Sequence, residues 1–261
     1  MQNSFEKIPI QILDDHIQAA SWIAETIATL ITEKKQKGEF AVIGLATGST
    51  PTNVYKELVK RHKTEGLSFK NVITFNLDEY YPMEPYRLQS YVRFMNEHLF
   101  NHIDIDPKNI HIPDGTIAKE DITDFCTNYE AQIEKVGGID IQLLGIGRNG
   151  HIGFNEPGSD RNSKTRLITL EHSTIADAAS DFYGEDDVPR RAVTMGISTI
   201  LKARKIILMA LGEGKSKIIR EAVEGPITNH VPASFLQKHP NTIVLLDKAS
   251  ANDLTRSKTP W

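Results

Sequence analysis

One histidine and one glutamate lie five positions apart in the stretch GIGRNGHIGFNEP, residues 145–157. Its four glycines permit an irregular backbone, and the imidazole of His151 is a side chain that can exchange protons near neutral pH. Glu156 could orient the ring or stabilise its protonated form, as acids do beside catalytic histidines. These residue types indicate acid–base chemistry, and the alternative is a glycine-rich loop with a structural histidine.

Two other chemistries fit this stretch poorly. The spacing is not HExxH, and none of the other histidines lies at a ligand-like interval from His151, so we expect no metal site. The segment ATGST, residues 46–50, is not a GxSxG elbow, which argues against a Ser-His-acid nucleophile.

A pair of acids follows an expected strand in FNLDEYYP, residues 75–82. A partly buried carboxylate at this place can have a raised pKa and serve as a general base. Adjacent side chains of an extended segment face opposite ways, so we expect only one of Asp78 and Glu79 to enter a site. The alternative is a pair of solvated loop acids.

Two loops have the composition of an anion site. In LATGSTP, Thr47, Gly48, Ser49 and Thr50 lie between an expected strand and a helix, where small residues, hydroxyls and backbone N–H groups suit a phosphate. Lys215 in LGEGKSK begins a later helix, and its ammonium could reach the same phosphate. Neither loop is a Walker or GxGxxG pattern, so no nucleotide is indicated. The alternatives are an ordinary capped helix and a solvated lysine.

The elements that position these loops follow from hydrophobic periodicity. Strands and helices alternate, which predicts an α/β fold with a mainly parallel sheet and helices on both faces. Binding residues of such folds gather where strands end, so the four loops above could converge. Residues 153–162 are expected to form an irregular functional loop. We expect helices in residues 14–37 (capped by Asp14 or Asp15), 51–62, 88–100, 121–137 and 214–225, and strands in 40–50, 71–81 (a strand with a loop), 139–147, 205–212 and 242–247.

Composition narrows the class of protein. The 261 residues carry a net charge of −4, so no general positive field favours nucleic acid or an anionic membrane. Cys126 is the only cysteine, which excludes an intramolecular disulfide and suits a reducing cytoplasm. There is no secretory signal pattern, and no apolar run reaches about 18 residues. We expect one cytoplasmic domain spanning residues 1–261.

Several stretches together resemble the glucosamine-6-phosphate deaminase family, within a wider group that includes the 6-phosphogluconolactonases. LDEY combined with GHIGFNEP is specific, because the lactonases share the fold and phosphate loop but typically lack this pair. The resemblance implies a Rossmann-like three-layer α/β/α domain and a hydrolase-type enzyme of amino-sugar catabolism. It would convert glucosamine 6-phosphate and water to fructose 6-phosphate and ammonia without a cofactor. The matching stretches are LATGSTP, FNLDEYY, SYVRFMNEHLF, LLGIGRNGHIGFNEPGS, RRAVTMGISTIL and LGEGKS.

The resemblance also implies residue roles. Asp78 matches the general base that moves a proton from C2 to C1 of the opened sugar. His151 matches the residue that assists opening of the pyranose ring, with Glu156 as its partner. The loop of residues 47–50 and Lys215 match the phosphate-binding positions.

Two departures from the family pattern concern the site. Asn149 stands where many members have aspartate, so the imidazole has one negative neighbour fewer. The family's phosphate-binding arginine has no match, and the aligned region offers Ser180 and Asp181. Arg190, Arg191 or a neighbouring subunit could replace it.

A third departure concerns regulation. Ser159 and Arg166 match residues of the allosterically activated members, but the family's lysine position reads Ile168. Activation by N-acetylglucosamine 6-phosphate is therefore expected to be weakened. The chain stops at RSKTPW, and the apolar Trp261 would suit a truncated part of a longer protein that continues into a deacetylase-like domain.

Two alternatives to the deaminase remain open at this stage. One is a 6-phosphogluconolactonase-like enzyme or simple sugar-phosphate isomerase on the same fold. The other is a non-catalytic sugar-phosphate sensor, which the missing arginine favours. Family members are often symmetric oligomers, so a homo-oligomer is expected.

Overall fold

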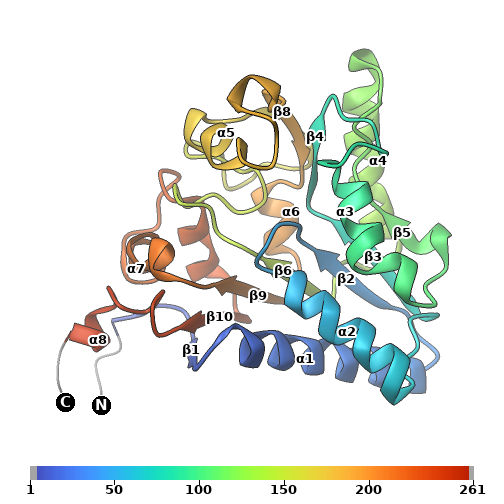
Figure 1. The fold of residues 1–261 in the computed structure, drawn as a ribbon, viewed down its shortest axis with the longest axis horizontal. Helices are drawn as coiled ribbons and strands as arrows, with labels where there is room; N and C mark the ends of the chain where they lie inside the picture. Colours follow the sequence, from blue (N-terminus) through green and yellow to red (C-terminus); the bar gives the residue numbers. More distant parts are fainter. Residues whose placement is uncertain (1–4, 259–261) are drawn as a thin grey trace.

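The fold is built on a large parallel sheet with helices on both faces (Figure 1). The structure, a computed structural model, describes residues 5–258, so the expectation about Trp261 lies outside the described part. All neighbouring strands of the seven-stranded sheet are parallel, which confirms the predicted architecture. The order is β1 (Ile10–Leu13), β10 (Thr242–Asp247), β9 (Lys205–Ala210), β6 (Ile141–Leu144), β2 (Ala41–Leu45), β3 (Val72–Asn76) and β5 (Ile110–His111).

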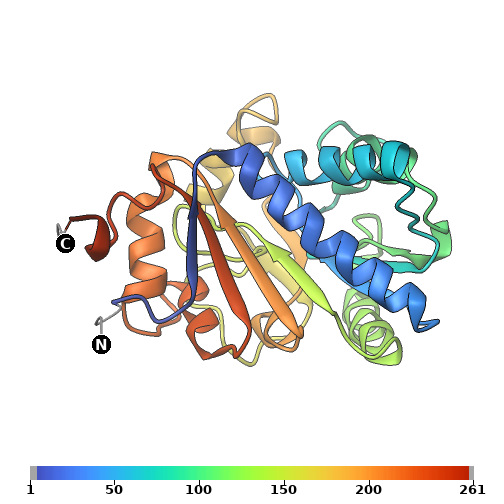
Figure 2. The same ribbon diagram turned by 90° about the horizontal axis from the view of Figure 1, so that it is seen from below.

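Two helical layers cover the sheet because its central strands are apolar on both faces. In β2, Val42 packs into one layer while Ala41 and Ile43 pack into the other, as the two-residue repeat of a strand requires. Figure 2 shows the long helix α1 crossing one face. That layer contains α1 (His16–Gln36), α2 (Thr52–Glu65) and α3 (Tyr91–His98), and the opposite layer contains α4 (Ile122–Lys135), α6 (Ile197–Leu201) and α7 (Ser216–Glu224).

Helix ends agree with the predicted signals. The side chain of Asp15 caps α1 by accepting hydrogen bonds from the backbone N–H groups of Ile17 and Gln18, each at 2.8 Å. Gly225, which follows the last residue of α7, lies at the end of the helix expected in residues 214–225. Three short helices were not anticipated: α5 (His172–Ala178), α6 and α8 (Thr255–Lys258).

A second sheet of three antiparallel strands corrects one prediction. Residues 78–81 were expected to form a loop after β3, but they form β4 (Asp78–Tyr81). This segment pairs with β8 (Arg191–Thr194), which in turn pairs with β7 (Arg166–Thr169). The pairing joins segments more than 100 residues apart in the chain, so local periodicity carries no signal for it. In consequence the predicted acid pair lies on a strand whose backbone is fixed by a ladder.

The irregular span after β6 behaves as predicted. Residues 153–162 contain no helix or named strand, and a single bridge pairs Ile152 with Asn155.

Within residues 5–258, none of the helices has the length and apolar character needed to span a membrane.

Candidate active site

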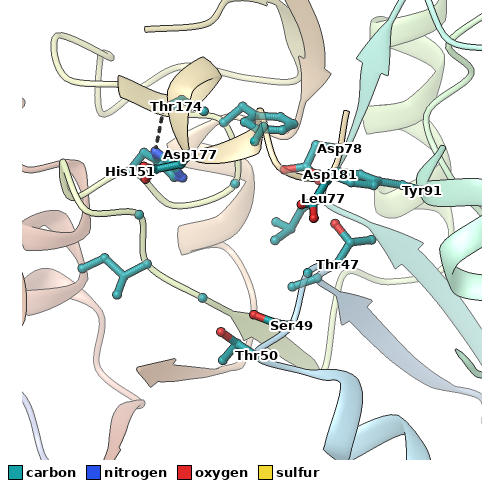
Figure 3. Close-up of a pocket in the computed structure, with 18 of the residues that line it drawn as sticks. Thr47, Ser49, Thr50, Leu77, Asp78, Tyr91, His151, Thr174, Asp177 and Asp181 are labelled. Carbon is teal, nitrogen blue, oxygen red and sulfur yellow. Dashed lines mark hydrogen bonds between the residues drawn. The ribbon is translucent and has the colours of Figure 1, made fainter. Parts of the chain in front are cut away.

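The four predicted loops meet around one open cavity of about 260 Å³ at the carboxyl ends of β2, β3, β6 and β9 (Figure 3). Parallel strands bring their carboxyl ends to one edge of a sheet, which explains the convergence. Of the residues singled out from the sequence, Thr47, Gly48, Ser49, Thr50, Asp78, His151, Lys215 and Asp181 line this cavity. The lining also includes residues with no sequence signal, among them Tyr80, Tyr91, Phe154, Thr174 and Asp177.

Asp78 is the acid of the predicted pair that enters the cavity. Its side chain is 6% exposed, and this burial, with a smaller effect of the neighbouring Glu79, raises its pKa to about 8. In Figure 3 the side chain lies on the opposite side of the cavity from His151. A carboxyl group with this pKa is a suitable general base near neutral and mildly alkaline pH.

Glu79 points away from the cavity, as the alternation of a strand predicted. Its carboxylate accepts hydrogen bonds from the backbone N–H groups of Tyr80 at 2.9 Å, Tyr91 at 2.8 Å and Val92 at 3.2 Å. The hydroxyl of Ser90 donates to the same carboxylate at 2.9 Å. Burial raises the pKa of Glu79 to about 7, against the opposing effect of these hydrogen bonds. The acid therefore ties β4 to the first turn of α3.

That first turn carries Tyr91 into the cavity wall. Its ring contacts that of Tyr80 with centroids 5.1 Å apart, and its hydroxyl shares hydrogen bonds with the hydroxyls of Tyr80 and Thr47. Burial raises the pKa of Tyr91 well above its usual value, so the phenol stays neutral. The sequence gave Tyr91 no role beyond its place in a helix, one residue after the Ser90 cap.

His151 contacts two residues, Glu156 and Asn149, that do not themselves line the cavity. Its Nδ1 lies 3.4 Å from Oε2 of Glu156, and Asn149 Nδ2 donates to the same oxygen at 2.8 Å. The Asn149 side-chain oxygen accepts from the backbone N–H of His151 at 3.1 Å. Thr174 Oγ1 lies 3.4 Å from Nδ1 on the cavity side (Figure 3).

Glu156 remains ionised in this arrangement. Burial works against ionisation, but the hydrogen bond and charge of His151, with hydrogen bonds from Thr174 and Asn149, hold the pKa of Glu156 below its usual value. The carboxylate also accepts a hydrogen bond from the backbone N–H of Glu171 at 3.2 Å. An ionised acid beside Nδ1 orients the imidazole and leaves Nε2 for chemistry.

Glycine is required beside the histidine. A Cβ atom on Gly147 would lie 2.2 Å from Cε1 of His151, so a larger residue would displace the ring. Gly150 has a φ of +87°, which side-chain-bearing residues rarely adopt. The glycine-rich composition therefore serves the placement of the imidazole.

The loop of residues 47–50 keeps its hydroxyls at the cavity. The residue that caps α2 is Pro51, which makes no side-chain hydrogen bond, so the alternative of an ordinary Ser/Thr-capped helix is wrong. Figure 3 shows Ser49 and Thr50 together at the start of this helix. Exposed backbone N–H groups and hydroxyls at a helix start suit an anion.

Lys215 is also not a solvated surface lysine. It is half-buried, and its Nζ donates to the carbonyl of Ile146 at 2.8 Å, which fixes the ammonium against the loop after β6. Burial lowers the pKa of Lys215, and the positive charge of Arg148 lowers it further.

The proposed replacements for the missing arginine lie elsewhere. Arg190 is exposed and lies 3.6 Å from Asp186, while the guanidinium of Arg191 lies 5.5 Å from the ring centre of Tyr81. Neither lines the cavity, and Ser180 does not line it either, whereas its neighbour Asp181 does.

The residues matched to allosteric regulation lie together outside the cavity. Arg166 donates to Ser159 Oγ at 3.2 Å and to the side-chain oxygen of Asn155 at 2.9 Å. Ile168 lies on the same strand, β7.

Within residues 5–258, histidines, cysteines and acids form no group of three or more suited to a metal ion.

Comparison with known proteins identifies the family of this chain. The profile of the glucosamine-6-phosphate isomerases/6-phosphogluconolactonase family matches residues 14–245. A glucosamine-6-phosphate deaminase of Thermoanaerobacter pseudethanolicus is 47% identical over 88% of each chain. A glucosamine-6-phosphate deaminase-like protein of Bacteroides thetaiotaomicron is 49% identical over 98% of this chain, which spans only 39% of that protein's length.

Solved structures give the same picture. A monomeric glucosamine-6-phosphate deaminase superposes with a TM-score of 0.90 at 41% identity, covering 94% of this chain and 100% of the other. A 6-phosphogluconolactonase from Trypanosoma brucei superposes with a TM-score of 0.78 at 20% identity, covering 96% and 100%, which shows a shared fold. This chain belongs to the glucosamine-6-phosphate isomerase/6-phosphogluconolactonase family.

Proposed function

We propose that this chain is a glucosamine-6-phosphate deaminase, which converts glucosamine 6-phosphate and water to fructose 6-phosphate and ammonia. One observation carries the proposal: a buried carboxyl group, Asp78, faces a histidine–glutamate pair across a cavity that also contains the start of a helix, where an anion would be favourable. Relatives of similar length that are 47% identical bear the name of this enzyme.

Ring opening is the task of His151. The substrate reaches the site as a cyclic hemiacetal, and opening it requires a proton to leave the C1 hydroxyl and a proton to reach the ring oxygen. His151 performs this transfer while Glu156 balances the positive charge of the imidazolium. Asn149 holds the Glu156 carboxylate and the histidine backbone in this geometry.

Isomerisation is the task of Asp78. The ionised carboxylate removes the proton from C2 of the open aldehyde, and the electron pair of that bond forms the enol double bond between C1 and C2. The electrons of the C1 carbonyl move onto its oxygen, which takes up the proton that the ammonium group at C2 loses. Returning the C2 proton to C1 then draws the nitrogen electron pair into a double bond and gives an imine at C2. Water then adds to C2 and the C–N bond breaks, which releases ammonia and leaves the ketone of fructose 6-phosphate.

The phosphate anchors the substrate for both steps. Residues 47–50, with their hydroxyls and N–H groups, and Lys215, with its ammonium, all line the cavity. Anchoring the distal end fixes C1 and C2 between acid and base, which lowers the entropic cost of the reaction. We also propose that the protein acts in the cytoplasm, because the buried single thiol of Cys126 suits a reducing compartment. We further propose that the protein forms a homo-oligomer.

An ammonia-release assay with glucosamine 6-phosphate tests the function, with 6-phosphogluconolactone assayed side by side. We expect ammonia and fructose 6-phosphate in equal amounts. Lactone hydrolysis without ammonia would identify a lactonase, isomerisation without ammonia an isomerase, and binding without any turnover a sensor. Each of these three outcomes contradicts the proposal.

The variant Asp78→Asn tests the assigned base. Removing a general base costs about 10²- to 10⁴-fold in kcat. Because the pKa of Asp78 is raised to about 8, the base is ionised only at and above that pH, so kcat/KM of the unaltered protein should rise up to about pH 8 and then level. Full turnover in the variant, or a flat profile between pH 6 and 9, would rule out Asp78 as the base.

A further inference from the structure

Arg148 lies beside the cavity, although it is not itself one of the lining residues and belongs to no motif assigned to phosphate binding. It sits in the tight turn between Gly147 and His151, and both of these neighbours line the cavity. The turn is closed by hydrogen bonds from Gly147 N to the His151 carbonyl and from Gly150 N to the Gly147 carbonyl, each at 3.0 Å. The position of the Arg148 side chain is therefore tied to that of the imidazole.

An acid of the cavity wall holds the guanidinium. Arg148 Nε donates to Asp177 Oδ2 at 2.9 Å, and its Nη2 pairs with the other carboxylate oxygen. Asp177 belongs to α5 and lines the cavity near His151 (Figure 3). The two-pronged pairing holds the guanidinium beside a residue of the cavity wall, in a geometry that a phosphate would also accept.

Arg148 and Lys215 form a pair of neighbouring cations. Both are attached to the loop after β6, Arg148 by its backbone and Lys215 through the hydrogen bond from Nζ to the Ile146 carbonyl. They are close enough for the charge of Arg148 to disfavour the protonated form of Lys215, an effect that adds to burial. Placing like charges together costs free energy, and an anion bound between them would remove that cost.

We propose that Arg148 is a substrate-binding residue, which holds the phosphate group of the sugar together with Lys215 after exchanging Asp177 for that phosphate. The inference rests on the proposed function for the identity of the phosphate compound. The arginine side chain is 62% exposed and Asp177 35%, so their ion pair is a weak surface interaction. A phosphate dianion bound by two cations is a stronger partner than one carboxylate.

The inference also accounts for the charge of the site. Arg190 and Arg191 pair with groups outside the cavity, so they leave Lys215 as the permanent cation of the lining. Arg148 supplies a second cation from the loop after β6. The segment aligned with the family's arginine has Ser180 and Asp181 instead.

Steady-state kinetics of Arg148→Ala with two substrates test the inference. With glucosamine 6-phosphate we expect KM to rise about 10- to 100-fold, as for loss of a charge-assisted hydrogen bond, and kcat to change less than about twofold. With glucosamine, which has no phosphate, kcat/KM should stay the same. Arg190→Ala, which also removes an exposed arginine with an acidic partner, is the matched control and should leave both substrates unaffected.

A second variant examines the exchange with Asp177. Asp177→Asn removes the competing charge and keeps the size of the side chain, so KM for glucosamine 6-phosphate should fall several-fold. The conservative variant Arg148→Lys should recover part of the affinity lost in Arg148→Ala, because it restores the charge but not the two-pronged geometry.

The outcomes separate the inference from the proposed function. An unchanged KM for glucosamine 6-phosphate in Arg148→Ala, or an equal loss with glucosamine, would overturn the role of Arg148 while leaving the deaminase proposal standing. If the unaltered protein releases no ammonia at all, the deaminase proposal fails. Calorimetric titration with inorganic phosphate then decides the role of Arg148: weaker binding to Arg148→Ala than to Arg190→Ala supports it, and equal binding overturns it.

Discussion

At the scale of single residues, Glu79 does two things for the base beside it. It adds a negative charge next to Asp78, and it fixes the turn that carries Tyr91 into the cavity wall. Because the charge of Glu79 contributes to the raised pKa of Asp78, Glu79→Gln should lower that pKa while burial still keeps it raised. The rise of kcat/KM with pH should therefore move to lower pH, as a full pH–rate profile would show.

Ser90→Ala is the control for this effect. It removes one hydrogen bond to the Glu79 carboxylate, at 2.9 Å, but leaves the charge in place. The profile should then keep its position, even if stability falls by about 1 kcal/mol. If both variants moved the profile equally, loss of structure would explain the effect and the electrostatic role of Glu79 would be wrong.

The site residues that could be predicted from the sequence are those whose side chains commonly take part in catalysis or binding. Asp78, His151 and Lys215 were predicted because acids, imidazoles and ammonium groups can take part in catalysis or binding, and because the binding residues of α/β folds gather at strand ends. Tyr91 and Arg148 could not be predicted in this way. A tyrosine in an amphipathic helix is typical of a core, and an arginine in a turn is typical of a surface, so only their three-dimensional neighbours distinguish them.

At the scale of elements, the parallel sheet was predictable and the antiparallel one was not. Alternating strands and helices leave few ways to arrange the chain, since parallel strands need crossovers of one hand and short connections. The small sheet depends instead on β4 pairing with β8, which comes more than 100 residues later and also pairs with β7. This pairing turns the expected loop at Asp78 into a fixed strand, so it positions the base.

The small sheet continues into α6 through a close approach at Gly196. A Cβ atom there would lie 2.1 Å from the carbonyl oxygen of Ser163, which is backbone and cannot move aside. Gly196→Ala should therefore lower the free energy of unfolding by about 1–3 kcal/mol, as overpacking typically does, measured by urea denaturation. Gly214→Ala meets no atom within 4 Å and should change it by less than about 0.5 kcal/mol. Equal effects would mean that this contact is not tightly packed.

At the scale of the whole molecule, the acid pair couples activity to stability. Burial raises the pKa of Asp78 from 3.8 to about 8, so between these values the folded protein binds a proton that the unfolded chain releases. The stabilisation of the folded protein by this bound proton is complete below about pH 4 and is lost as pH rises through about 8. In the same pH range Asp78 becomes ionised and active as a base. The conditions that favour turnover are thus the ones in which this group destabilises the fold.

The variant Asp78→Asn isolates the contribution of Asp78 ionisation to stability, because asparagine cannot ionise. Above pH 8 the variant should be more stable than the unaltered protein by at least ~1 kcal/mol, or about 2–4 °C in Tm. At pH 5 the difference should be smaller, and it should vanish only below about pH 4, where Asp78 is protonated in both the folded and the unfolded state. Thermal denaturation of both proteins at pH 5 and pH 8.5 measures it. A Tm difference that is the same at both pH values would mean that Asp78 has no raised pKa, and the pH dependence of its activity would then require another base.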